Sequence, residues 1–69
     1  MVEVFKTNVN KVSQARKIII SLLQHFPESK INFDLDDCDR ILKIEGSNFI
    51  IHKVLTVVKI NGFECQVLE

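Results

Sequence analysis

The hydrophobic pattern of this chain changes its period several times within 69 residues, and the order of these periods restricts the possible folds more than any other feature. The stretch "KINFDLDD" alternates, with Ile31, Phe33 and Leu35 on one side and polar residues between them. A period of two is typical of a strand with one buried face. The turn "DDCD" and the run "RILKIEG" follow, so we expect a hairpin whose second strand buries Leu42 and Ile44 and ends at a glycine.

A helix is expected before this hairpin. In the stretch "KVSQARKIIISLLQHFP", apolar residues recur at alternating intervals of three and four, which indicates the buried stripe of an amphipathic helix: Val12, Ala15, Ile19, Leu22 and Phe26. We expect Asn10 to be the N-cap and Pro27 to stop the helix. The β-rich run "VEVFK" predicts a first strand over residues 2–6.

The stretch "FIIHKVLTVVKIN" combines many β-branched residues with a helical spacing of Ile51, Leu55 (or Val54) and Val58. Its length favours a helix over a strand. Ser47 and Asn48 would offer the N-cap, Lys59 would complement the dipole of the last turn, and Gly62 would take the left-handed conformation that commonly follows a helix. The closing run "FECQVLE" predicts a last strand with one apolar face, formed by Phe63, Cys65 and Val67.

The resulting order is strand, helix, strand, strand, helix, strand. It predicts a single domain over residues 1–69 with an α+β, ferredoxin-like βαββαβ fold, in which both helices cover one face of a four-stranded antiparallel sheet. Because 46% of the residues are hydrophobic, a core without a metal or a disulfide is feasible even at this length. The pattern leaves open whether Phe5 points into the core or joins Ile41 and Leu68 on the helix-free face.

Charge and hydropathy exclude several partners. Basic and acidic residues number nine each, so the chain lacks the excess of positive charge that drives nonspecific nucleic-acid binding. No apolar run approaches the roughly 20 residues that cross a bilayer, and the N-terminus has no signal-like segment. We therefore expect no nucleic acid and no membrane as partner, a cytoplasmic location, and free thiols at Cys38 and Cys65.

Two segments carry a resemblance to a known family. The hairpin "KINFDLDDCDRILKIEG" and the ending "NGFECQVLE" resemble the central hairpin and closing strand of the heavy-metal-associated domains, which include copper chaperones and the N-terminal modules of metal-transporting ATPases. The resemblance implies the ferredoxin-like fold. It also implies a Met-x-Cys-x-x-Cys motif between the first strand and the first helix, where two thiolates hold a soft ion such as Cu(I).

This chain departs from the family at that motif. If Phe26 and Pro27 match the family's Leu-Pro helix end, Asn10 stands at the Met position and Val12 and Ala15 stand at the two Cys positions. Soft ions need deprotonated sulfur, which these side chains lack. We expect aliphatic packing there in place of a metal, and no cofactor.

Other chemistry is weakly represented. No Ser/His/Asp or Cys/His grouping and no glycine-rich phosphate loop is visible, so we expect no enzyme activity. The same absence of a glycine-rich loop weakens a third reading, an amino-acid sensor of this topology. Cys38 lies in the expected turn at the same end as the lost motif, whereas Cys65 belongs to the far edge strand. The alternative to a metal-free domain is therefore a soft-metal (copper or zinc) carrier that uses Cys38 together with ligands of a partner.

Charged residues are unevenly distributed around this end. Lys6, Lys11 and Arg16 flank the first loop, and Asp36, Asp37 and Asp39 lie in the hairpin turn. Exposed ion pairs that contribute about 0–1 kcal/mol are the plain explanation, and a dipolar docking surface for a protein partner is the functional one. The sequence thus favours a non-enzymatic interaction or regulatory module, with self-association through the sheet or its edge as a further possibility.

Overall fold

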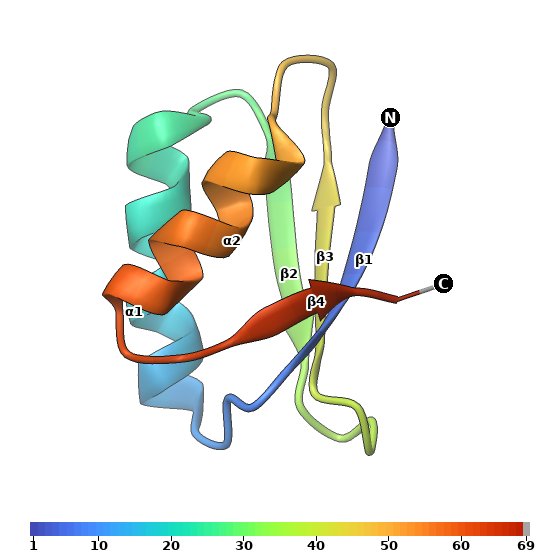
Figure 1. The fold of residues 1–69 in the computed structure, drawn as a ribbon, viewed down its shortest axis with the longest axis vertical. Coiled ribbons are helices and arrows are strands. Elements are labelled where there is room, and N and C mark those ends of the chain that lie inside the picture. The colour runs from blue at the N-terminus through green and yellow to red at the C-terminus, as the bar shows by residue number, and fades with distance from the viewer. Residues whose placement is uncertain (69) are drawn as a thin grey trace.

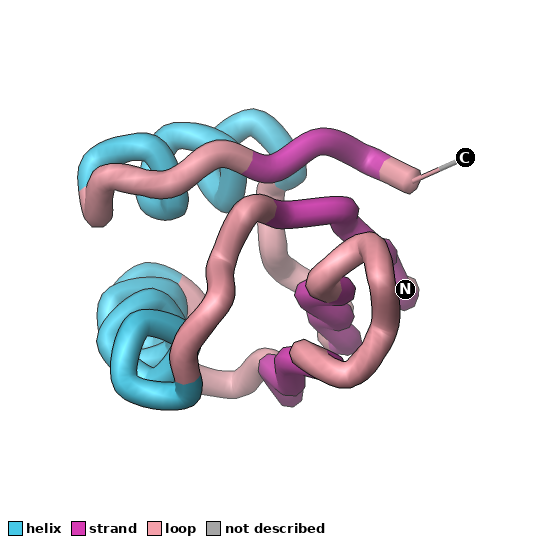
Figure 2. Tube along the Cα trace, turned by 90° about the horizontal axis from the view of Figure 1, so that it is seen from below, coloured by secondary structure: helices cyan, strands magenta, loops and turns pink. Residues whose placement is uncertain are grey.

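The computed structural model describes residues 1–68 as one layer of strands covered by one layer of helices (Figure 1). Four antiparallel strands form a sheet in the order β2-β3-β1-β4, and both helices lie on the same side of it (Figure 2). The elements follow the order β1 (Val2–Thr7), α1 (Val12–His25), β2 (Lys30–Asp34), β3 (Ile41–Glu45), α2 (Ile51–Ile60) and β4 (Cys65–Val67). This is the expected ferredoxin-like α+β fold.

The register of the sheet determines which side chains enter the core. Phe5 lies opposite Leu42 of β3 and Val67 of β4. Phe5 and Leu42 are both fully buried, because they point to the helix-covered face. The open question about Phe5 is thereby answered, and Val2 and Val4 point to the helix-free face. The hairpin prediction is also confirmed, since Leu42 and Ile44 are buried and the alternating residues of β2 are half-buried.

The core is aliphatic and aromatic throughout, and helices, strands and loops all contribute to it. The buried hydrophobic residues are Phe5, Val9, Ala15, Ile18, Leu22, Phe26, Leu42, Ile44, Phe49, Val54, Val57 and Val58. Within residues 1–68, no buried side-chain nitrogen or oxygen lacks a hydrogen-bond partner. Burial of this kind contributes about 25 cal/mol per Å² of apolar surface, which makes it the main stabilising term for so small a domain.

Helix α1 begins at Val12 and turns its buried face differently from the predicted stripe. Ala15, Ile18 and Leu22 form that face, whereas Val12 is 64% exposed and Ile19 is half-buried. The expectation that both motif positions are filled by packing is therefore wrong for Val12 and correct for Ala15. Three consecutive isoleucines at 18–20 allow two different stripes, and the stripe that faces the sheet passes to one side of Val12.

Helix α2 confirms the choice of a helix for the β-branched stretch. Its buried residues are Val54, Val57 and Val58, and Ile51 and Leu55 are half-buried. The N-cap is Ile50, so the prediction of a cap at Ser47 or Asn48 is wrong. The longer loop inserts Phe49 into the core before the helix starts. Gly62 follows the helix with a φ of 90°, as predicted.

Within residues 1–68, neither helix has the length and apolar character that crossing a lipid bilayer requires.

Candidate docking surface at the loop end

Three loops meet at one end of the molecule. They are residues 8–11 between β1 and α1, residues 35–40 between β2 and β3, and residues 61–64 between α2 and β4, all at the lower end in Figure 1. We call this end of the molecule the loop end. It contains the positions at which the resemblance to heavy-metal-associated domains implies a metal site.

The last residue of β1, Thr7, and the residue after it, Asn8, join the other two loops through hydrogen bonds. The backbone N–H of Thr7 donates to the carbonyl of Asp39 at 3.1 Å, and the Thr7 hydroxyl donates to the carbonyl of Arg40 at 2.6 Å. On the other side, the Asn8 N–H donates to the Glu64 carbonyl at 3.3 Å, and the Glu64 N–H donates to Asn8 Oδ1 at 2.9 Å. These four bonds connect the first loop to the hairpin turn on one side and to the loop before β4 on the other.

Asn10 connects the hairpin to the start of α1. Its Oδ1 atom accepts a hydrogen bond from the Arg40 guanidinium at 2.6 Å, and the Gln14 side chain accepts from the N–H groups of Asn10 and Lys11, both at 3.1 Å. Helix α1 begins at Val12, so Lys11 is its N-cap and the N-cap prediction for Asn10 is wrong. Arg40 has a φ of 49°, which turns the chain back into β3.

Sequence reasoning missed Thr7, Asn8 and Arg40 as organising residues of this end. A polar residue at a strand end gives little signal by itself, because its partners lie 30 or more residues away in the sequence. The asparagines in "TNVN" indicated a turn but not the acceptors and donors that they would meet.

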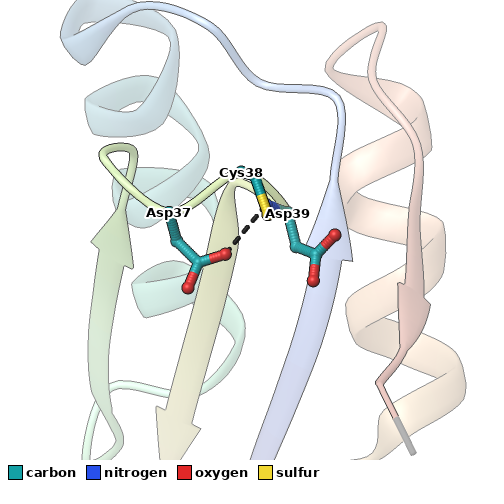
Figure 3. Close-up of side chains that lie close together, drawn as sticks. All are labelled: Asp37, Cys38 and Asp39. Atoms are coloured by element: carbon teal, nitrogen blue, oxygen red, sulfur yellow. Dashed lines mark hydrogen bonds between the residues drawn. The ribbon is translucent and has the colours of Figure 1, made fainter.

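The hairpin turn positions Cys38 between two carboxylates. Asp37 Oδ1 accepts a hydrogen bond from the Asp39 N–H at 2.8 Å (Figure 3), and Asp34 Oδ1 accepts from the Asp36 N–H at 3.2 Å. These are the local side-chain to backbone bonds by which aspartate stabilises turns. Cys38 is an exposed free thiol at the tip of this turn.

Potential metal ligands meet at one place within residues 1–68. One ligand atom each from Asp37, Cys38 and Asp39 lies within 4.8 Å of the others. This set offers one soft sulfur and two hard oxygens, and the Asp37 carboxylate also supports the turn. It differs from the two-thiolate set that a soft ion prefers.

Cys65 does not belong to that group. It starts β4 opposite Thr7, at the sheet edge farthest from β2. Burial raises the pKa of the Cys65 thiol to about 11, because the surrounding apolar groups disfavour the thiolate. Cys65 is thus a protonated, packing thiol at neutral pH, and it contributes no metal ligand together with Cys38.

The charged residues named from the sequence all lie around the loop end, but they differ in their contacts. Lys6 and Asp39 approach each other, with 3.8 Å between Nζ and Oδ1, and both side chains are partly exposed. Arg16 and Asp36 line opposite sides of a groove between α1 and β2. Lys11 is exposed at the start of α1 and makes no ion pair with residues 1–68. Asp37 is part of the turn itself.

Comparisons with known proteins add no relative. No protein-family model matches the chain, and no curated protein or solved structure matches it. The similarity to heavy-metal-associated domains therefore rests on the residues of the hairpin and the closing strand.

Proposed function

We propose that this chain is a non-enzymatic interaction or regulatory domain, similar to heavy-metal-associated domains, whose metal site has been lost and whose loop end binds a protein partner. The supporting observation is the loop end itself. Hydrogen bonds that involve Thr7, Asn8 and Arg40 hold the three loops together, while most of the charged side chains around them remain exposed. A surface of fixed shape loses little entropy on binding.

Charge separation gives this surface an orientation. Lys11 and Arg16 form a basic side at the start of α1, and Asp36 and Asp39 form an acidic side on the hairpin. Of these, Asp39 is in an ion pair with Lys6 within the chain. Such an arrangement favours a partner with the opposite polarity and raises its association rate more than its affinity. Free thiols at both cysteines fit a reducing compartment, so we place this binding in the cytoplasm.

Loss of the metal site is supported by the donors at the motif positions. Val12 and Ala15 offer only carbon atoms, and Asn10 Oδ1 already accepts a hydrogen bond from Arg40. A soft ion bound there would lack sulfur ligands altogether.

The alternative is a soft-metal carrier that binds copper or zinc through Cys38. The observation in its favour is the group formed by Asp37, Cys38 and Asp39. A single thiol would need further sulfur ligands from a partner or a second copy. Titration with Cu(I) under reducing conditions separates the two functions. Our proposal expects no stoichiometric binding by the isolated chain, whereas binding that is lost in Cys38→Ser would support the carrier.

The docking function is tested by affinity capture followed by binding of the purified partner. We expect a captured protein to bind the wild-type chain more weakly at high salt, since screening reduces attraction between exposed charges. Lys11→Glu and Arg16→Glu should each reduce this binding several-fold. Lys53→Glu is the matched control, because it causes the same change in net charge from an exposed site on α2. Equal losses in all three variants would refute a loop-end docking surface.

A further inference from the structure

Helix α1 carries a second apolar row in addition to the row that enters the core. Val12 is 64% exposed, Ile19 is half-buried and Leu23 is 37% exposed. Their spacings of seven and four residues place them along one flank of the helix, beside the buried row of Ala15, Ile18 and Leu22. The chain thus has more apolar surface on α1 than its own sheet covers.

This flank of α1 borders a groove at the free edge of the sheet. The groove has a volume of about 480 Å³ and is lined by Val12, Arg16 and Ile19 of α1 together with residues of β2 and the following turn. On the strand side it is lined by the consecutive run from Asn32 to Asp36, in which Phe33 points to the helix-covered face of β2. Because β2 is the end strand of the sheet, this run places the groove next to the free edge. Figure 2 shows α1 beside this end strand of the sheet.

Strand β2 has a free edge, because β3 is its only neighbour in the sheet that residues 1–68 form. A free edge presents unpaired backbone N–H and C=O groups, which readily pair with another strand. The sequence of β2, "KINFD", is complementary to itself in an antiparallel arrangement. When two copies pair antiparallel about Asn32, Lys30 faces Asp34 of the second copy, and Ile31 faces Phe33.

Other arrangements are less favourable. Parallel pairing in register would place Lys30 against Lys30 and Asp34 against Asp34, and like charges directly opposite each other are destabilising. The other sheet edge, β4, is shorter, with three residues against five in β2. Charged side chains also surround β4, since Lys6, Lys59 and Glu64 line the groove next to it.

We infer that this groove and the free edge of β2 bind a second copy of the chain, through antiparallel β2–β2 pairing about Asn32. The pairing joins the two sheets into one continuous sheet of eight strands. On the helix-covered side, the α1 flanks of the two copies approach each other, and the exposed row of Val12, Ile19 and Leu23 is removed from water. This inference requires no other protein, although Arg16 and Asp36 of the proposed docking surface line the same groove. The experiment below separates the two proposals, because it changes only Lys30 and Asp34 of the strand edge.

The arrangement is tested by a charge-swap experiment with sedimentation equilibrium as the measurement. We expect the wild-type chain to show a concentration-dependent change from monomer to dimer mass. In a dimer of Lys30→Asp, the new carboxylate of each copy faces Asp34 of the other copy. In a dimer of Asp34→Lys, the new ammonium group of each copy faces Lys30 of the other copy. Each variant alone should dimerise at least roughly tenfold more weakly. An equimolar mixture of the two variants restores opposite charges at both positions, so the dimer should return.

The mixture also separates association from folding. Lys30 faces Glu45 of its own chain, so Lys30→Asp is expected to lower the stability of the monomer. Mixing does not change either monomer, and recovery of the dimer mass can only come from contacts between copies. Ile60→Glu is the control, because Ile60 is 79% exposed on α2, away from the β2 edge, and this variant should dimerise like the wild type.

The inference is overturned if the wild-type chain stays monomeric at every concentration, if the mixed variants fail to associate, or if Ile60→Glu abolishes the dimer. An extended segment of another protein is the competing occupant of the edge. That occupant is indicated if the wild-type chain is monomeric and binds such a segment, and if Asp34→Lys binds the segment more weakly.

Discussion

The guanidinium of Arg40 donates a hydrogen bond to Oδ1 of Asn10 at 2.6 Å and thereby joins the central hairpin to the start of α1. The two residues are 30 positions apart in the sequence. Their contact fixes the first loop where heavy-metal-associated domains hold their ion. In this chain, a hydrogen bond between two side chains is therefore one of the interactions that keep the loop end in shape.

Removal of this bond should cost a modest amount of stability. We expect Arg40→Ala and Asn10→Ala each to lower the free energy of unfolding, with a coupling energy of about 0.5–1.5 kcal/mol in a double-mutant cycle. Urea denaturation of the four proteins measures this energy. Arg16→Ala, combined with Asn10→Ala in the same way, is the control and should show additive effects. A coupling near zero for Arg40 and Asn10 would mean that the bond makes no net contribution.

The exposure of Val12 leads to a second prediction. Val12→Ala should change the free energy of unfolding by no more than about 0.5 kcal/mol, because little apolar surface is lost from the core. Ile18→Ala, on the buried row of the same helix, should cost about 2–5 kcal/mol. Thermal or urea unfolding distinguishes the two. Comparable losses for both variants would contradict the orientation of α1.

Introducing cysteines at positions 12 and 15 tests the resemblance to metal-binding domains. We expect the double variant Val12→Cys with Ala15→Cys to gain Cu(I) binding, since the two thiolates would lie on adjacent turns at the loop end. Titration against a competing chelator under reducing conditions measures the gain. Lys53→Cys with Thr56→Cys has the same spacing on the exposed part of α2 and serves as the control. Equally tight binding by both pairs would leave the loop end with no special relation to metals.

The buried thiol of Cys65 predicts a dependence of stability on alkaline pH. Its folded-state pKa of about 11 lies above the ordinary value of 9.0, because burial disfavours the thiolate. The unfolded chain therefore loses this proton first, and the contribution to stability should be complete below pH 9 and decrease between about pH 9 and 11.

Comparison with Cys65→Ala isolates this effect from other groups that titrate in the same range. The difference in the free energy of unfolding between the two proteins should change between pH 9 and 11 and be constant below it. Alkylation provides a second measurement, in which the exposed Cys38 should react at neutral pH well before Cys65. Equal alkylation rates for the two cysteines in the folded protein would contradict the burial of Cys65.

The order of helices and strands could be predicted from the sequence because most elements have a recognisable period or a recognisable end. Alternation from Ile31 to Leu35 identified β2, and Gly62 marked the end of α2 with the conformation that the structure has. The direction of the Phe5 side chain could not be predicted from β1 alone, because apolar residues lie on both faces of this strand. It follows from the pairing of β1 with β3 and β4.

The site was less predictable, for physical reasons that are visible in α1. Apolar residues occupy positions 18–20, 22 and 23, so two rows of the helix are hydrophobic and the pattern does not say which one faces the sheet. Asn10 has the side chain of a good N-cap, yet a long-range bond to Arg40 uses its oxygen. Local patterns miss such contacts because the competing partner comes from a distant part of the chain.

The central position of β1 in the sheet has a consequence for the time course of folding. Its two neighbours, β3 and β4, come from the middle and the end of the described sequence. During synthesis, β1 emerges from the ribosome before β4 and stays without this partner until β4 has emerged as well. Sheets that depend on such distant pairings form slowly compared with helical bundles. We therefore expect nascent chains that stop before Cys65 to remain sensitive to proteases.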